Sequence, residues 1–208
     1  ILPIVVQVAP APRTVYSGGV SVGTDSGFGV RTGVRRRWLN ERGHKANLEF
    51  DLSQRLTAGA ANYEILLPGE NLRSLNFGLT HLREDTDTSE SETTSVFAME
   101  NRQWRGWLRD VGLRALYSDF TIGEERNSST LVFAEGRLFR RRANDDLFPT
   151  RGYSLRLEAR AGAEALASDT DFVQVRAEGR LIHPLGERQR GYLRATMMLR
   201  SEERRVGK

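Results

Sequence analysis

Strict alternation between apolar and polar residues runs through long segments of this chain. In the segment 153–161, Tyr, Leu, Leu, Ala and Ala alternate with Ser, Arg, Glu and Arg, and the segments 46–53, 173–181 and 193–199 follow the same rule. Successive side chains of a β-strand point to opposite faces, so this spacing predicts strands with one apolar and one charged face. None of the segments keeps the helical spacing of about 3.6 residues over three turns.

Turn-forming Gly, Pro, Asn and Asp residues separate about eleven such segments. The expected strands are 14–23, 29–38, 45–54, 60–68, 74–84, 94–104, 107–121, 130–141, 152–162, 171–183 and 191–200. Most are longer than the about 5 to 6 residues of soluble strands and close to the about 9 to 11 that cross a bilayer when tilted. We therefore expect an all-β antiparallel meander that forms part of a transmembrane β-barrel.

The composition excludes several classes of protein. The chain has no Cys, which removes disulfide frameworks and thiolate metal sites. It has no apolar run near the about 18 residues of a membrane helix. Its 31 Lys and Arg residues are nearly balanced by 27 Asp and Glu residues, and both signs share the polar side of each strand. This mixture favours a barrel interior crossed by salt bridges.

Residues that could carry catalysis are few and lack a recognisable context. The three histidines, His44, His81 and His183, lie outside any HExxH or GxSxG pattern, and no phosphate-binding loop occurs. The acidic pairs 84–85 and 145–146 could hold a hard cation only through loop geometry, because adjacent strand residues point to opposite faces. We expect a protein that is not an enzyme and that has no catalytic residue, metal site or cofactor.

Two arginine triplets stand beside aromatic residues, Arg35 to Arg37 before Trp38 and Arg140 to Arg142 after Phe139. A nucleic-acid surface would show such clusters, but it would also show a larger excess of basic residues than a net charge of +4. We expect both triplets at the membrane interface, where arginines reach the head groups, and no nucleic-acid partner. The expected interface residues are Arg35, Arg36, Arg37, Trp38, Trp104, Trp107, Arg140, Arg141 and Arg142.

The connections between the expected strands alternate in character. Every second connection of a meander lies on the same side, and the odd-numbered ones are small, polar or acidic. They are 24–28, 55–59, 85–93, 122–129 and 163–170, and two of them are expected to be long. The even-numbered connections carry Pro, Asn-Gly-like or aromatic residues, which predicts that the odd-numbered side is the extracellular face.

Three stretches carry a family resemblance, and they lie at Tyr16–Gly27, Arg37–His44 and Asp145–Tyr153. They resemble the opening hairpin, the first periplasmic turn and the fourth periplasmic turn of the BamA/TamA outer-membrane assembly superfamily, and within it the TamA family. The residues that match the turn motifs are Thr24, Asp25, Gly27, Trp38, Asn40, Gly43, His44, Phe148, Pro149, Arg151 and Gly152.

The resemblance implies a sixteen-stranded barrel preceded by periplasmic POTRA domains, in the outer membrane of a Gram-negative cell. Residues 1–12 would be the end of the last POTRA domain and a linker, with the N-terminal end in the periplasm. Residues 13–200 would be the N-terminal part of the barrel, truncated before the family's loop-six motif. The polar string 201–208 breaks the alternation and is expected to be a non-native tail.

The resemblance also implies a function, the insertion of client β-barrels such as autotransporters, with a TamB-like periplasmic partner and outer-membrane lipids around the barrel. The first strand would provide a weak lateral seam, since Gly18 and Gly19 reduce its packing. The expected seam residues are Tyr16, Ser17, Gly18, Gly19, Val20, Ser21 and Val22. In a second interpretation, the two glycines leave room for a bulky neighbour inside the barrel.

Other functions remain open from the sequence. A general barrel-assembly subunit or a two-partner secretion transporter would share the superfamily motifs. A passive porin-like channel would share the alternation without the POTRA domains, and a soluble β-sandwich binder would have shorter strands.

Overall fold

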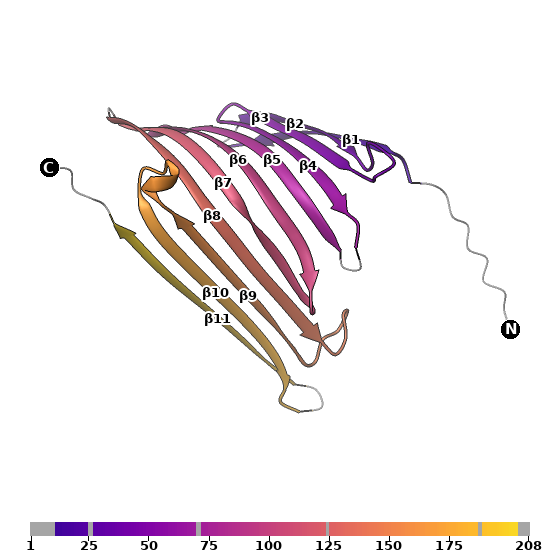
Figure 1. Cartoon of the computed structure of the whole chain (residues 1–208). Coiled ribbons are helices and arrows are strands. Elements are labelled where there is room, and N and C mark those ends of the chain that lie inside the picture. The colour runs from indigo at the N-terminus through magenta and orange to yellow at the C-terminus, as the bar shows by residue number, and fades with distance from the viewer. Residues whose placement is uncertain (1–10, 25–26, 70–71, 124, 187–188, 204–208) are drawn as a thin grey trace.

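The computed structural model describes residues 11–203, except 25–26, 70–71, 124 and 187–188. They form one curved sheet in which eleven strands pair in sequence order, β1 to β11, all antiparallel (Figure 1). The strands are β1 Thr14–Gly23, β2 Gly27–Arg36, β3 Lys45–Ser53, β4 Leu56–Leu67, β5 Arg73–Asp85, β6 Ser89–Trp104, β7 Trp107–Ile122, β8 Glu125–Ala143, β9 Gly152–Gly162, β10 Asp171–Pro184 and β11 Arg190–Glu203. The expected all-β meander is confirmed.

The eleven expected strands are present, but β6 and β8 begin earlier than expected, so the expected connections 85–93 and 122–129 are replaced by tight turns. β5 and β6 continue to a tight turn at residues 86–88, where Thr86 donates its N–H to the Ser89 carbonyl oxygen at 2.9 Å. β7 and β8 likewise meet at Gly123, whose φ of 63° suits a tight turn. The polar residues in these segments pair through their backbones, so they extend the strands instead of forming loops.

The expected domain boundaries are only partly within the described residues. Of the expected POTRA end and linker, 1–12, residues 1–10 lie outside them. β11 continues through residues 201–203, three residues beyond the expected end of the barrel segment. Residues 204–208 of the expected tail are also outside the described part.

The strands are strongly staggered across the sheet. Following register partners from Arg36, at the end of β2, leads through all intervening strands to Ser201, near the opposite end of β11. Such a steady shift of register requires strands that tilt relative to the axis around which the sheet curls. The sheet is therefore an unclosed segment of a barrel.

The two faces of the sheet differ as the alternation predicts. One face, here called the apolar face, carries Leu113 of β7, Leu157 of β9 and Leu199 of β11 among its side chains. On β7 this apolar belt runs from Val111 to Tyr117, and the charged residues Arg109 and Asp119 border it ten residues apart. At about 3.3 Å per residue and a tilt near 40°, that separation corresponds to a height of about 25 Å, the height of the apolar band of an outer-membrane barrel.

The other face, here called the polar face, contains the buried strand residues. Glu135 is 5% exposed and its Oε1 lies 2.8 Å from Nη2 of Arg114, while Glu178 lies 2.7 Å from Arg180. The apolar residues Met99 and Phe133 are buried on the same face. These pairs confirm the expected salt-bridged interior. Among the described residues, no helix is long and apolar enough to cross a membrane.

Candidate functional site

β1 forms one edge of the sheet. Among the described residues it pairs with β2 alone, in unbroken register from the Thr14 and Arg36 pair to the Gly23 and Gly27 pair. Its apolar-face side chains are well exposed, with Tyr16 at 76%, Val20 at 75% and Val22 at 81%. Within the described sheet, the expected seam strand is therefore an edge strand with exposed apolar side chains on one face.

The contact between β1 and β2 is built from small residues on the polar face. Ser17 is the register partner of Gly33, and Ser21 is the partner of Gly29. A Cβ on Gly33 would stand 2.8 Å from the Ser17 Oγ, and one on Gly29 would stand 2.7 Å from the Ser21 Oγ. Glycine at both β2 positions lets the serines of β1 approach closely. The sequence interpretation did not identify this complementarity, because it depends on the register.

Gly18 and Gly19 are different from the β2 glycines. A Cβ on Gly19 would meet no atom within 4 Å, and one on Gly18 would meet only the Arg31 carbonyl oxygen at 4.0 Å. Within the described residues, no bulky neighbour occupies the space beside them. The described strands lie on one side of β1 only, so both interpretations of the two glycines remain predictions.

The turn between β2 and β3 is tied to the start of β1. Arg13 donates its Nε to the Trp38 carbonyl oxygen at 2.9 Å and its Nη2 to the Leu39 carbonyl oxygen at 2.8 Å. These bonds hold residues immediately before the edge strand against the turn. Arg13 therefore links the start of β1 to the β2–β3 turn.

The same turn closes around Asn40. Its carbonyl oxygen accepts the Gly43 N–H at 3.0 Å, and its side-chain oxygen accepts the His44 N–H at 3.2 Å. Gly43 has a φ of 74°, which favours glycine. His44 Nδ1 lies 2.7 Å from the Tyr63 hydroxyl on β4, so this histidine has a structural partner. The motif residues Asn40, Gly43 and His44 therefore shape the turn and attach it to the sheet.

The turn between β8 and β9 has its own network. Asn144 Oδ1 accepts the N–H groups of Thr150 and Arg151, at 3.1 and 2.9 Å. Asp145 Oδ1 accepts the N–H groups of Phe148 and Leu147, at 2.9 and 2.8 Å. These bonds hold the pKa of Asp145 below its usual value, the Phe148 bond contributing most.

The remaining motif residues have different positions. Pro149 accepts a bond from Arg190 Nη1 through its carbonyl oxygen at 2.9 Å, which joins the β8–β9 turn to the start of β11. A Cβ on Gly152 would lie 2.6 Å from the Arg142 carbonyl oxygen, so glycine is required there. Gly27 begins β2 with a φ of 67°, close to the Thr24 turn. Asp25 lies outside the described residues.

The two arginine triplets divide between the faces of the sheet. Register places Arg36, Arg140 and Arg142 on the apolar face, and Arg35 and Arg141 on the polar face. Arg37 follows β2 and donates its backbone N–H to the Arg13 carbonyl oxygen. The interface role expected for the triplets remains a prediction, and on geometry it concerns the three residues of the apolar face.

The aromatic residues that accompany the triplets lie at one end of the sheet. Trp104 and Trp107 are register partners beside the two-residue turn between β6 and β7, and Trp38 follows β2. This end also carries the turns β2–β3 and β8–β9, and it is called the motif end below. Figure 1 shows successive turns alternating between the motif end and the opposite end.

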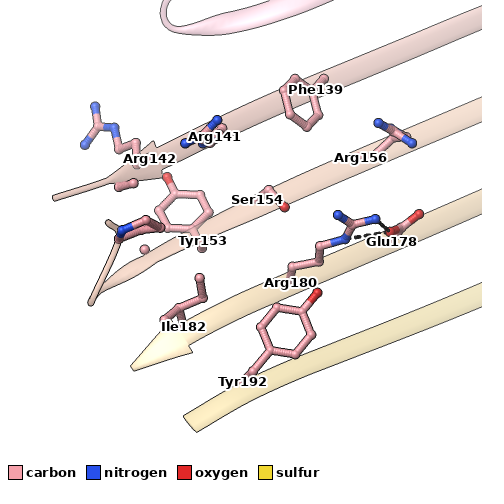
Figure 2. A pocket seen from close by; sticks show the side chains of 13 residues that line it. Phe139, Arg141, Arg142, Tyr153, Ser154, Arg156, Glu178, Arg180, Ile182 and Tyr192 are labelled. Atoms are coloured by element: carbon pink, nitrogen blue, oxygen red, sulfur yellow. Dashed lines mark hydrogen bonds and ion pairs between the residues drawn. The ribbon is translucent and has the colours of Figure 1, made fainter. Parts of the chain in front are cut away.

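The polar face carries a hollow near the motif end, with a volume of about 340 Å³. Arg156, Arg180 and Tyr192 line it from three strands, and Glu178 is bonded to Arg180 within it (Figure 2). The sequence interpretation missed this hollow, because only the register of β8 to β11 brings its residues together. Its lining combines charged side chains with aromatic and aliphatic ones.

The described residues were also expected to hold no metal site and no catalytic histidine. Among the described residues, no three His, Cys, Asp or Glu side chains gather as metal ligands. His81 Nδ1 lies 3.0 Å from Thr94 Oγ1, and His183 Nδ1 lies 2.8 Å from the Pro184 carbonyl oxygen. Each of these histidines thus has a partner on its own or the adjacent strand.

Comparison with known proteins agrees with this architecture. Residues 15–206 match the model of the Omp85 superfamily domain. The fold is similar to the crystal structure of BamA from Haemophilus ducreyi lacking POTRA domains 1–3, with a TM-score of 0.75 and 13% sequence identity. The match covers 92% of this chain and 42% of that chain. At this identity the likeness establishes the fold alone.

Proposed function

The chain belongs to the Omp85 superfamily of outer-membrane β-barrels, and we propose that it assembles other β-barrel proteins in the outer membrane of a Gram-negative cell. In this proposal the motif end faces the periplasm, where unfolded clients arrive. β1 is the edge that receives the first client strand. The family membership carries the proposal, and the small residues of β1 support it.

The physical basis is the cost of unpaired backbone in lipid. Each N–H or C=O group without a partner costs several kcal/mol in hydrocarbon, so an exposed strand edge at membrane depth strongly favours any strand that can pair with it. If β1 separates from a closing strand, it offers ten residues of such an edge. A client strand that adds to it forms backbone hydrogen bonds of the same kind as a closed barrel.

The residues of β1 suit a reversible contact. Ser17, Gly19 and Ser21 face inward and Gly18 faces outward, so half of the strand contributes little side-chain packing to a neighbour. Tyr16 and Val20 supply the lipid-facing contacts. A seam with these side chains opens at lower cost than one lined with large residues on both faces. Client folding provides the free energy, so a nucleotide is not required.

Within the superfamily we propose the TamA branch, with autotransporters as clients and a TamB-like protein as the periplasmic partner. The order and spacing of the three motif stretches support this choice. A general assembly subunit would serve most outer-membrane barrels. Depletion of the protein in cells separates the two, because the TamA role predicts a selective loss of surface autotransporters while abundant porins remain at their normal levels.

Site-specific cross-linking tests the β1 edge directly. A photoreactive amino acid replaces Val20 in the full-length protein, and an outer-membrane client is expressed at the same time. We expect an adduct that joins Val20 to a terminal strand of the client during assembly. Leu113 is the matched control, because it is 58% exposed on the same apolar face but lies in the middle of the sheet.

The outcomes of this experiment are distinct. Adducts at position 20 with none at position 113 support strand addition at β1. Equal labelling at both positions would mean that clients touch the barrel without using its edge. Assembly of the client with no adduct at position 20 would overturn the proposal and favour a passive channel.

A further inference from the structure

Three arginines stand directly opposite one another on the apolar face near the motif end. Arg73 of β5 is the register partner of Arg102 of β6, which is in turn the partner of Arg109 of β7. Like charges placed directly across a sheet repel one another. A row of three such residues therefore needs compensation from negative charge.

The protein supplies only part of that compensation. Glu100 Oε1 lies 2.8 Å from Arg73 Nε and 3.2 Å from Arg109 Nη2. A fourth arginine, Arg140 of β8, stacks over Trp107 with its guanidinium carbon 5.4 Å from the ring centre. Four guanidinium groups and one carboxylate leave three positive charges in excess on this part of the face.

Unused hydrogen-bond donors mark the same place. The Nε atoms of Arg102, Arg109 and Arg140 are buried and have no hydrogen-bond partner among the described residues. A buried donor without an acceptor costs free energy, more so when it is charged. The cluster thus lacks both negative charge and acceptor oxygens.

The position of the cluster identifies the chemistry that could supply them. Arg109 borders the apolar belt, next to Val111, and the partnered residues Trp104 and Trp107 lie on the side away from the belt. Tryptophan at such a boundary is typical of the zone of lipid head groups. A group bound here would meet apolar side chains on one side and arginines on the other.

We propose that Arg73, Arg102, Arg109 and Arg140 form a binding site for the phosphate of an anionic phospholipid. Guanidinium groups bind phosphate oxygens through paired N–H donors, and the register gathers four of these groups on one part of the face. The acyl chains would lie along Val111 and Leu138, which follow Arg109 and precede Arg140 on the apolar face. The proposal depends on the membrane placement of the sheet but not on client assembly at β1.

Native mass spectrometry of the full-length protein tests this site. The protein is released from detergent in the presence of phosphatidylglycerol or phosphatidylcholine with identical chains. We expect phosphatidylglycerol to be retained about tenfold more strongly, which corresponds to about 1.4 kcal/mol. The double variant Arg102→Gln and Arg109→Gln should reduce the preference to less than about twofold.

Two further variants separate a lost site from a damaged fold. Arg83→Gln is the matched control, because Arg83 lies on the same face of β5 at the opposite end and is already paired with Glu90. It should retain the preference of the natural protein. Glu100→Gln removes the one carboxylate of the cluster and should strengthen retention of phosphatidylglycerol, a gain that misfolding cannot produce.

Each alternative outcome contradicts the proposal in a recognisable way. Equal retention of the two lipids, or an unchanged preference in the double variant, would remove the site. Displacement of phosphatidylglycerol by millimolar inorganic phosphate would indicate a general anion site. Loss of lipid preference together with normal cross-linking at Val20 would leave the proposed function intact, which keeps the two proposals separable.

Discussion

Ser17 of β1 and Gly33 of β2 are register partners so closely packed that the Ser17 Oγ lies 2.8 Å from where a Cβ on Gly33 would stand. The Leu48 carbonyl oxygen lies 3.2 Å from the same point, on the other side of β2. β2 is therefore confined between its two neighbours at this position. The close contact between β1 and β2 therefore depends on glycine, which has no Cβ, at position 33.

Gly33→Ala is expected to weaken the attachment of β1. The added methyl group must displace Ser17 and press on the Leu48 carbonyl oxygen, so the free energy of unfolding should fall by about 1–3 kcal/mol. Urea unfolding of the full-length protein in detergent, followed by tryptophan fluorescence, measures this change. Gly136→Ala is the control and should have little effect, because Gly136 has described strands on both sides and its Cβ meets no atom within 4 Å. Equal stability of the two variants would contradict the packing described here.

Glu135→Gln should destabilise the barrel interior. The Glu135 carboxylate is 5% exposed and faces Arg114 at 2.8 Å and Arg160 at 3.8 Å, so its neutralisation leaves two guanidinium groups without a counter-charge. We expect the free energy of unfolding to fall by about 2–3 kcal/mol. This is less than the cost of breaking a fully buried ion pair, because Arg160 is half exposed.

Asp87→Asn is the comparison for that experiment. Asp87 pairs with Arg55 at 2.7 Å, but its side chain is 81% exposed. Exposed ion pairs contribute little to stability. The free energy of unfolding, measured by thermal unfolding, should therefore change by less than about 0.5 kcal/mol. Similar effects of the two substitutions would show that burial does not govern the interior pairs.

Gly152→Ala should disturb the hairpin formed by β8 and β9. The new Cβ would lie 2.6 Å from the Arg142 carbonyl oxygen and 3.0 Å from the Ala143 Cα, both of them backbone atoms that cannot rotate away. We expect lower thermal stability and faster proteolysis within residues 144–151. Gly136→Ala, on the same hairpin, meets no atom within 4 Å and should leave both measurements unchanged.

The β8–β9 turn should lose order in acid through Asp145. Its pKa is lowered in the folded protein by the Phe148 and Leu147 N–H groups. The stability that these two bonds give the turn is therefore fully present above the pKa of the unfolded chain, about 3.9, and is lost as the pH falls through the lower pKa of the folded protein. Amide chemical shifts of Phe148 and Leu147 in nanodiscs measure the midpoint. Asp145→Asn should abolish the titration, and a midpoint above about 3.9 would contradict the assignment.

The positions of the strands could be predicted because period-two alternation is local. In the segment 153–161 the polarity of each residue indicates the face of the sheet to which it points. The structure places that strand at Gly152–Gly162. Strand ends were less predictable where polar residues continue the pairing, as at Ser89 and Glu125, since nothing in composition separates a polar strand from a polar loop. For this reason, tight turns at 86–88 and Gly123 replace the longer expected connections 85–93 and 122–129.

The site residues were only partly predictable. Asn40 and Asp145 stand in turns whose side-chain bonds are short-range, so their motif stretches could be recognised from sequence. The row of Arg73, Arg102 and Arg109 could not, because these residues become neighbours only through the register of three strands. The pairing of Ser17 with Gly33 was hidden for the same reason.

β6, β7 and β8 have 16, 16 and 19 residues, whereas β1, β2 and β3 have 10, 10 and 9. Charged residues such as Asp119 end the apolar belt before these long strands do, so the rim away from the motif end is uneven. The rim extends further from the motif end at β6, β7 and β8 than at β1, β2 and β3. A macromolecule that approaches this rim contacts the hairpins of β6, β7 and β8 first. Access to β1 is less obstructed, because the neighbouring strands β2 and β3 are short.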